Sequence, residues 1–346
     1  MLEKKSSLAL IPKARGIFAH LLTEQEYDEL MHKRSVAEIA AYLRSHPYFR
    51  DSLAGIQETD IHRRRLEDLL SRDIYYKYEA LRRYDFSSGS FARFFLIDCE
   101  IRELLYVLHM IATGSAEQYI TRLPAFLADR TSFDLLALAH ARSFDSVLAA
   151  LRGTPYHKLL APLLTPPAVF DYAVCEHALR SYYYTTAMAL VDRSFSKKEG
   201  ALVRELLTRE AEIYNLDVIY RIKAFFPDSY SAADIEALLL PVSCEIPRKR
   251  LLEMAAARDL PALAAVYKGY GYNRDYGDFE EEGSSACAWR HLYEISRRAL
   301  RFSSSPGTVL AAALLLARIE RSNIINIIEG VRYGMDPADI RLLLKY

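Results

Sequence analysis

Three recurring pairs of polar side chains are the best candidates for chemistry in this chain of 346 residues. Each pair begins with a glutamate, and a second carboxylate or an amide follows three residues later: Glu100 and Glu103, Glu212 and Asn215, and Glu320 and Asn323. Residues i and i+3 share one face of a helix, so each pair predicts a polar strip on an otherwise apolar helix. Carboxylates that converged could bind a cation or act as general acid and base.

The polar strips allow a catalytic and a structural interpretation. In the first, Glu100, Glu212 and Glu320 converge on a metal ion or a reacting group. In the second, they hydrogen-bond neighbouring helices or line a central surface. Their threefold recurrence favours the structural interpretation, because an active site seldom repeats all of its parts. Asparagine replaces Glu103 in the other two strips, which also weakens the case for a metal site.

Other catalytic signatures are missing from the sequence. It contains no GxxxxGK[ST] or GxGxxG phosphate-binding loop and no HExxH zinc motif. Glu176 and His177 are adjacent, and adjacent helix positions diverge by about 100°, so they would not easily bind one metal ion together. We therefore expect no catalytic residue, no cofactor and no metal ion.

The elements that must position the strips recur as well. Residues 34–48, 142–156 and 258–272 read RSVAEIAAYLRSHPY, RSFDSVLAALRGTPY and RDLPALAAVYKGYGY, with starts 108 and 116 residues apart. Their second residue is a good N-cap, apolar residues follow at i, i+3, i+4 and i+7, and small residues or prolines end the pattern. Each segment closes on a tyrosine, which we expect to pack over the turn. A further landmark is an isoleucine about 20 residues after each strip: Ile120, Ile235 and Ile340.

These landmarks predict one unit of about 110 residues repeated three times. We expect units over residues 1–123, with a leader at 1–19, over 124–238 and over 239–346. Thirteen glycines and thirteen prolines are few for this length, and no strand alternation or hairpin-turn cluster is visible. The fold class we predict is all-α. The acidic, glycine-bearing stretch from Asp275 to Trp289 indicates a loop.

Charge and cysteine content limit the partners and the compartment. The 45 basic and 45 acidic residues balance, so nothing favours nucleic acid. Short basic runs, such as Arg63 to Arg65, form either a solvated helix face or a contact with an acidic partner. The 24 tyrosines fit either an interface or the rim of helical cores. The four scattered cysteines have no zinc spacing and suit a reducing cytosol, with Cys99 and Cys287 expected to be buried thiols.

Targeting and membrane-spanning segments are not expected. The start, MLEKKSSLALIPKA, has too short an apolar run for a signal peptide. The longest apolar run, Val309 to Ala317, is half of what a bilayer span needs.

Three segments resemble the C (or d) subunit family of V/A-type rotary ATPases. They are AHLLTEQEYDELMHKRSVAEIAAYLRSHPYFRDSL near the start, REAEIYNLDVIYRIKAFF at 209–226 and ERSNIINIIEGVRYGMDPADIRLLL near the end. The last is the closest match. It departs from the family at Arg321 and Ser322, where a second apolar or basic residue is usual, and at Glu103 the first strip departs from the asparagine of the other two.

The resemblance implies a funnel of three similar helical bundles around a pseudo-threefold axis. Such a subunit lies between the central axle of the soluble sector and the membrane proteolipid ring, one copy per complex, and transmits torque without catalysis. It is cytoplasmic and attached to the membrane only through its partners. On this basis we expect the polar strips to face the central funnel, where they hold the bundles together or receive the axle.

Two other functions stay open at this point. A generic helical-repeat scaffold for other protein partners would form an open superhelix rather than a closed funnel. A helical enzyme would use the strip carboxylates as a metal site and would carry stoichiometric metal.

Overall fold

A computed structural model describes residues 8–54, 63–85, 91–166, 168–242, 245–269 and 286–346. In these residues all regular structure is helical, which confirms the predicted fold class. The helices, α or 3₁₀ (η), are α2 Leu10–Ile17, η1 Phe18–His20, α3 Glu24–Met31, α4 Val36–Ser45, α5 Arg63–Arg82, α6 Arg93–Ala112, η3 Ala116–Arg122, η4 Ala125–Leu127, α7 Leu135–Ala139, α8 Phe144–Ala150, α9 Pro155–Leu164, α10 Tyr172–Ser194, α11 Lys197–Phe225, α12 Ala232–Ala237, α13 Arg248–Ala256, α14 Leu260–Gly269, α17 Ala286–Phe302, α18 Pro306–Tyr333 and α19 Pro337–Leu342.

The three recurring segments form the second helix of three short hairpins, α3–α4, α7–α8 and α13–α14. Their predicted N-caps are confirmed. Ser35 accepts a hydrogen bond from the Glu38 amide at 3.2 Å, Ser143 caps the amide of Ser146, and Asp259 accepts from Ala262 at 2.8 Å. Each cap satisfies an amide that the first helical turn leaves without an intrahelical partner. The same local sequence thus begins the same helix in all three hairpins.

The ends of these segments also follow the sequence pattern. Gly153 has φ of 81°, a left-handed conformation that costs glycine little, and it ends the turn after α8. Tyr48 and Tyr156, which close the first two segments, are both buried. Tyr272, which closes the third, lies outside the described residues.

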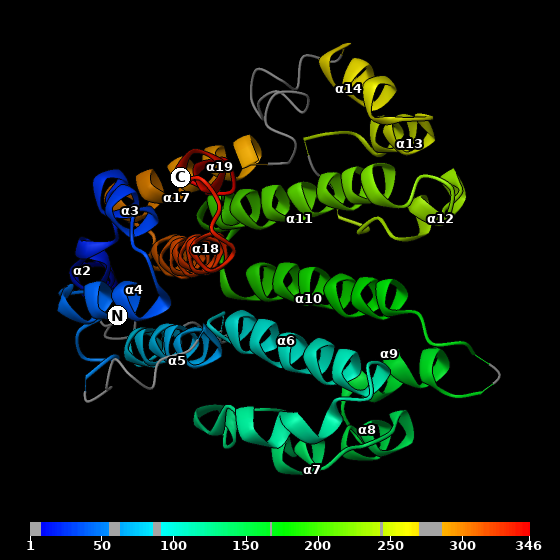
Figure 1. Cartoon of the computed structure of the whole chain (residues 1–346), viewed down its shortest axis with the longest axis horizontal. Helices are drawn as coiled ribbons and strands as arrows, with labels where there is room; N and C mark the ends of the chain where they lie inside the picture. Colours follow the sequence, from blue (N-terminus) through cyan, green and yellow to red (C-terminus); the bar gives the residue numbers. More distant parts are fainter. Residues whose placement is uncertain (1–7, 55–62, 86–90, 167, 243–244, 270–285) are drawn as a thin grey trace.

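Long helices form the centre of the molecule, and the hairpins lie on three different sides of them (Figure 1). These long helices follow the hairpins in pairs along the chain: α5 and α6, α10 and α11, α17 and α18. The second helix of each pair packs on the first helix of the next pair. Helix α6 packs on α10, α11 packs on α17, and α18 packs on α5. The last contact joins the end of the chain to its beginning.

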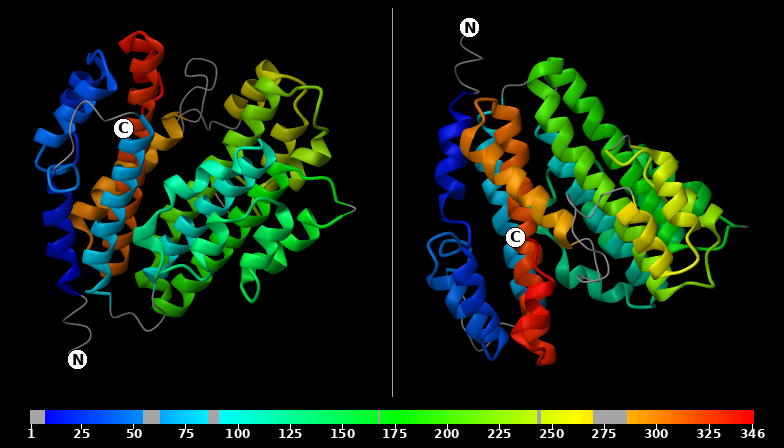
Figure 2. Two further views of the ribbon diagram at one scale, coloured as in Figure 1. Left: turned by 60° about the horizontal axis from the view of Figure 1, so that its bottom comes forward. Right: turned by 90° about the horizontal axis from the view of Figure 1, so that it is seen from above.

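Both views in Figure 2 place the blue N-terminal helices beside the red C-terminal end of the chain. Helix α18 packs on α2, α3 and α4, and α19 packs on α3. The rings of Tyr27 and Tyr346 stack at 4.6 Å, and Arg341 pairs with Asp28. The two ends of the sequence therefore share one packed interface.

The strip-bearing helices α6 and α18 end in the same way. Gly114 and Gly334 both adopt left-handed φ values, of 68° and 67°. In each case the next residue, Ser115 or Met335, donates its amide back across the last turn, which is a Schellman cap. Gly330 has a different role, because a Cβ there would lie 2.4 Å from Ile340, so glycine lets α19 fold back closely on α18.

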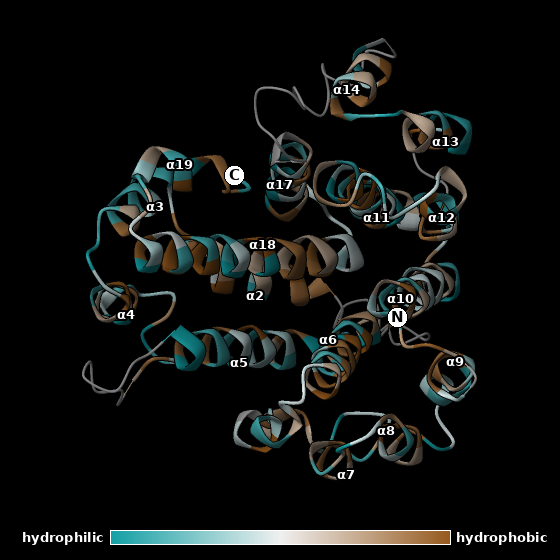
Figure 3. Cartoon of the chain, turned by 45° about the vertical axis from the view of Figure 1, so that its right-hand side comes forward, coloured by the Kyte–Doolittle hydropathy of each residue, from teal (hydrophilic) through white to brown (hydrophobic). Residues whose placement is uncertain are grey.

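The long helices differ from one another in hydropathy. In Figure 3, α18 is mostly brown and α5 largely teal. The apolar run predicted at Val309 to Ala317 is buried throughout within α18, as the packing of α5, α11 and α17 around it requires. In the described ranges, no helix is both long and apolar enough to cross a bilayer.

The isoleucine landmark is not equivalent in the three units, and the predicted loop does not extend to Trp289. Ile120 lies in the 3₁₀ helix η3 and is exposed, whereas Ile235 and Ile340 lie in α-helices and are fully buried. The predicted loop from Asp275 to Trp289 falls outside the described residues up to 285, but α17 already begins at Ala286. Ala288 is buried in α17, so the end of that stretch packs as part of the helix.

Candidate functional site

The glutamate of each polar strip holds a backbone amide at the entrance to a hairpin. Glu320 accepts from the Leu22 amide at 2.7 Å and Glu212 accepts from the Ile246 amide at 2.9 Å. Glu100 accepts from the Ser132 amide in the same way. All three glutamates are buried, with relative exposures of 5% or less. Each carboxylate therefore satisfies an amide of the chain, where water has little access.

These contacts run in a cyclic order. The strip on α6 holds the hairpin α7–α8, the strip on α11 holds α13–α14, and the strip on α18 holds α3–α4. Each strip therefore reaches forward to the following hairpin, and the third reaches back to the first. The Glu320–Leu22 bond joins residues 298 positions apart.

The second residue of each strip holds the segment that follows its own helix. The Asn215 side chain accepts from the Leu240 amide at 2.7 Å and donates to the Leu240 carbonyl at 3.4 Å. Asn323 accepts from the Lys345 amide at 2.8 Å. Glu103 instead accepts from the hydroxyl of Tyr119 at 2.8 Å. Asn215 and Asn323 therefore bond to backbone amides, whereas Glu103, at the equivalent position of the first strip, bonds to a side chain.

Burial changes the acidity of the third strip. It raises the pKa of Glu320 to about 8, although the Leu22 amide and Lys77 act in the opposite direction. The first strip is arranged differently, since the Tyr156 hydroxyl donates to Glu100 at 2.5 Å. Burial, together with the nearby Glu100 carboxylate, keeps the pKa of Tyr156 far above its ordinary value. Tyr156 is therefore a fixed donor to Glu100.

Three further charged residues belong to this site, and the sequence analysis missed them. Asp98, Glu210 and Arg318 each lie two residues before a strip glutamate, and they meet in the interior. Arg318 lies 2.9 Å from Glu210 and 3.6 Å from Asp98. The signal was visible, because a charged residue stood at the same place in all three strip helices. We call these residues the ionic triad.

Burial and charge act differently on the members of the ionic triad, and burial raises the pKa of Glu210 despite the neighbouring Arg318. Burial works against the ionised form of Asp98, but Arg102 and Arg318 hold its pKa below the ordinary value. Burial likewise works against the charge of Arg318, but Glu210, Tyr183 and Asp98 keep its pKa well above the ordinary value. The triad therefore places a guanidinium between carboxylates from two other helices, and so links α6, α11 and α18.

The strip carboxylates do not form a metal centre in the part of the chain that is described. No group of three or more histidine, cysteine, aspartate or glutamate side chains there is arranged to hold a metal ion. Glu176 and His177 are engaged separately: Glu176 pairs with Arg180, and His177 hydrogen-bonds the Leu238 carbonyl. Cys99 is a buried free thiol as predicted, whereas nothing is described of the Cys287 side chain.

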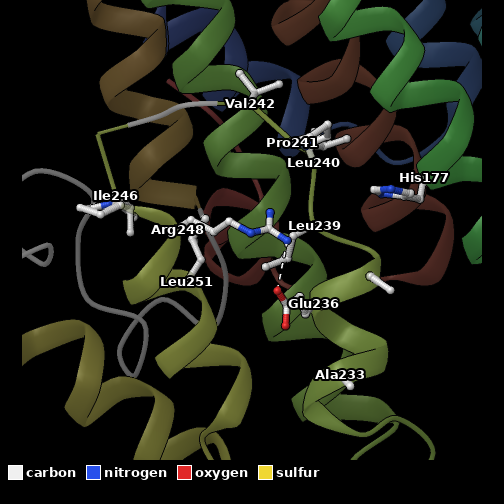
Figure 4. Close-up of a pocket in the computed structure, with 12 residues that line it drawn as sticks. His177, Ala233, Glu236, Leu239, Leu240, Pro241, Val242, Ile246, Arg248 and Leu251 are labelled. Carbon is white, nitrogen blue, oxygen red and sulfur yellow. Dashed lines mark hydrogen bonds and ion pairs between the residues drawn. The ribbon is translucent and has the colours of Figure 1, made fainter.

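A cavity of about 840 Å³ lies behind the second strip, between α10, α12 and α13. Figure 4 shows Arg248 paired with Glu236, at 3.4 Å, and His177 apart from this pair. Burial lowers the pKa of His177, which favours the neutral ring. Glu236 already faces a guanidinium, so the cavity offers no carboxylate–imidazole pair among the described residues for acid–base chemistry.

The geometry can be compared with known proteins. A sequence model of the family described as "ATP synthase (C/AC39) subunit" matches residues 10–343. The chain belongs to this family. The match includes all three polar strips, the ionic triad and the hairpins, so these features lie inside the family fold. It confirms the membership expected from the three resembling segments.

Curated relatives are similarly named. The C subunit of the A-type ATP synthase from Thermococcus kodakarensis is 25% identical over 232 residues, which cover 66% of this chain and 60% of the relative. Its namesake from Desulfurococcus sp. is 25% identical over 236 residues, with the same coverage. The chain thus spans about 60% of the length of the curated relatives it matches. The family assignment rests on the match to the ATP synthase (C/AC39) family over nearly the whole chain.

Proposed function

We propose that this chain is a non-catalytic central-stalk subunit of a V/A-type rotary ATPase. In this role it is a socket between the axle of the soluble sector and the membrane proteolipid ring, and it transmits torque for proton or sodium transport. The observation that carries the proposal is the family match over residues 10–343. In this role, one copy of the chain is present per complex, and its partners hold it at the cytoplasmic face of the membrane.

The arrangement of the chain as three units in a pseudo-threefold funnel is part of this proposal. Units at 1–123, 124–238 and 239–346 would each contribute a hairpin, two long helices and a polar strip. The cyclic packing of α6 on α10, α11 on α17 and α18 on α5 supports it. The ionic triad supports it further, because equivalent positions of three helices meet only near an axis that relates them.

The polar strips act, in this proposal, by holding the bundles together. Glu100, Glu212 and Glu320 are buried and already bind backbone amides, so their side chains serve the chain itself. Glu103, Asn215 and Asn323 then fix the segment after each strip helix. The axle would contact other residues of a funnel whose shape the strips maintain.

A subunit that passes torque must resist deformation. Close-packed interiors have low compressibility and transmit strain. Here the contacts between successive helix pairs link all three bundles, so one bundle cannot slide without disturbing the next. Buried ion pairs at the ionic triad add a cost to separation, because separating them would leave charges unpaired in the interior.

The test is reconstitution with the partner subunits of the same organism. We expect the purified chain to bind the axle and the ring, one copy per complex, and ATP-driven ion pumping to be lost when it is omitted. Lack of binding to either partner would overturn the rotor role and leave only a helical scaffold. Solution scattering separates the shapes, since a funnel is compact and an open superhelix is elongated.

The role of the strips is tested with charge-reversed variants. Glu212→Lys and Glu320→Lys should unfold at lower denaturant and lose axle binding, whereas Glu294→Lys on the exposed face of α17 should do neither. Cooperative folding and intact axle binding in both strip variants would count against the strips as supports and as axle contacts.

A further inference from the structure

A second cavity, of about 460 Å³, lies where α5, α6 and the η3–η4 segment meet α18. Four arginines line it: Arg65 and Arg72 from α5, Arg102 from α6 and Arg321 from α18. Two carboxylates, Asp68 and Glu103, also line it. The lining therefore carries an excess of two positive charges in a chain whose formal net charge is zero.

The arginines are incompletely satisfied by the described residues. Arg321 donates to the Ser71 hydroxyl at 2.9 Å and Arg72 donates to the Ser52 carbonyl at 3.3 Å, so both bind neutral oxygens. Arg102 lies 3.3 Å from Asp98 and donates to the Cys99 sulfur. The buried Nε atom of Arg72 has no hydrogen-bond acceptor in the described part of the chain, whereas the Arg102 Nε atom is the one that lies close to Asp98. Hydrogen bonds to neutral oxygens leave the positive charges of Arg72 and Arg321 uncompensated by those partners, so the cavity can accept an anion.

The charge environment of Arg321 also favours a bound anion. Burial lowers the pKa of Arg321 to about 10, and the neighbouring guanidinium of Arg102 acts in the same direction. Like charges brought together in a poorly solvated place disfavour the charged form. An anion in the cavity would offset this repulsion.

We propose that this cavity binds a small phosphorylated anion, with its phosphate groups held by Arg72, Arg102 and Arg321. A guanidinium fork matches two phosphate oxygens, and guanidinium groups from three helices can surround a group that carries several of them. The volume falls within the range of small-molecule sites and exceeds what a lone carboxylate would fill.

The rim of the cavity fits an organic group attached to the phosphate. Tyr76 and Phe126 line it, and the Tyr76 ring is largely exposed at 55%. An aromatic ring there can stack on a nucleobase or cover a sugar. Such a ligand would contact α5, α6 and α18 together, and so would reinforce the contact that joins the beginning of the chain to its end. The inference does not depend on the proposed rotary role.

The test is calorimetric titration of the purified full chain with pyrophosphate, and then with ATP, at constant ionic strength. We expect saturable binding that is at least tenfold weaker in Arg72→Gln and Arg321→Gln. Arg64→Gln is the matched control, because Arg64 is exposed on the same helix as Arg72 and does not line the cavity. It should bind as the natural chain does.

Several results would overturn the proposal. Equal weak binding of pyrophosphate and sulfate, or equal binding by the Arg64 and Arg321 variants, would mean general surface attraction only. Binding of a glutamate-rich peptide without binding of pyrophosphate would mark a protein-docking site instead.

Arg65→Gln provides a second variant at the exposed rim should Arg321→Gln fail to fold, and it should weaken pyrophosphate binding as well. Tyr76→Ala should remove only the extra affinity for ATP, and an unchanged ATP preference would exclude the rim as the site of the organic group.

Discussion

Glu212 and Glu320 each accept a hydrogen bond from a backbone amide at the entrance to a hairpin, and we call each such bond an amide clamp. The two clamps act at different kinds of junction. Glu212 holds Ile246, 34 residues further along the chain, whereas Glu320 holds Leu22, 298 residues away. Glu212 therefore supports a junction that the continuous chain already keeps together. Glu320 closes a junction between the two ends of the sequence, where only side-chain packing and hydrogen bonds act.

The surroundings of the two clamps differ as well. Lys77 on α5 lowers the pKa of Glu320, whereas Asp73 on α5 and Glu26 on α3 raise it. Burial raises the pKa values of Tyr27 and Tyr48, and the charge of Glu320 raises them further. At the closing junction the repeated hydrogen bond therefore has an acceptor whose pKa is raised to about 8. The closing junction is the one expected to open first.

Loss of the ionic triad should have the largest effect, because it disturbs all three strip helices at once. Arg318→Leu leaves the buried carboxylates of Asp98 and Glu210 without their shared cation. Removing one partner of a buried ion pair costs about 3–5 kcal/mol of the free energy of unfolding. Chemical denaturation measures this loss in the free energy of unfolding.

The control for this variant restores charge balance. Adding Glu210→Leu to Arg318→Leu should recover much of the loss, because Asp98 keeps its ion pair with Arg102 and Glu210 no longer carries a charge. A single variant as stable as the natural chain would show that the triad contributes nothing to the junction of the three helices.

Breaking the local clamp should cost less. Glu212→Leu removes the acceptor of the Ile246 amide, and an unsatisfied buried amide costs about 1–3 kcal/mol. Glu205→Leu on the same helix is the control, because the Glu205 side chain is 42% exposed and its ion pair with Arg209 contributes little near the surface. Hydrogen exchange at Ile246 should accelerate in the first variant and not in the second. If both variants lose equal stability, the clamp has no special role.

The closing clamp should make stability depend on pH. The folded pKa of Glu320, about 8, lies above its unfolded value of 4.5, so between them the folded chain binds one more proton. The free energy of unfolding must then decrease as pH rises from about 4.5 to 8. One pKa unit corresponds to about 1.4 kcal/mol, which sets the maximum slope per pH unit from this group.

Glu320→Gln isolates this contribution, since it keeps an acceptor for Leu22 and cannot titrate. Denaturation at pH 6, 7 and 8 should show the natural chain losing stability relative to the variant. Parallel pH profiles would contradict a raised pKa at the closing junction. Other carboxylates, such as Asp98, have lowered pKa values and act in the opposite direction, but they are common to both proteins.

The hairpins could be predicted from the sequence because their determinants are local. Ser35, Ser143 and Asp259 cap their helices within one turn, and the apolar spacing selects the buried face. The strip helices were also visible as polar pairs in apolar surroundings. The backbone amide that each strip glutamate binds could not be predicted, because the cyclic order of the strip-to-hairpin contacts depends on how helices far apart in sequence pack together.

The ionic triad is only partly recognisable in the sequence, where its members share a position but not a charge. Asp98, Glu210 and Arg318 occupy equivalent positions, but they differ in charge, so they do not look like a repeat. Their relation becomes clear only when three helices bring them together. The cavity with Arg72 and Arg321 lies between helices about 250 residues apart in sequence, as the bond from Arg321 to Ser71 shows, and no local pattern could have joined them.

The smallest effect should come from comparing the two tyrosines that donate to the first strip. Tyr156 donates its hydroxyl to the buried Glu100, whereas Tyr119 donates to Glu103, which is only half-buried. Hydrogen bonds to charged groups contribute about 1.5–3 kcal/mol when buried, and water replaces part of this where it has access. We expect Tyr156→Phe to cost about 1.5 kcal/mol and Tyr119→Phe about 0.5 kcal/mol of the free energy of unfolding, measured by chemical denaturation.

Tyr106→Phe, on α6 and half-buried, is the control for removing a hydroxyl elsewhere on the strip helix. Equal losses at Tyr156 and Tyr119 would mean that exposure does not distinguish the two positions of a strip. A larger loss at Tyr119 would make Glu103 the principal support of the first strip, and would reverse the order of the two carboxylates.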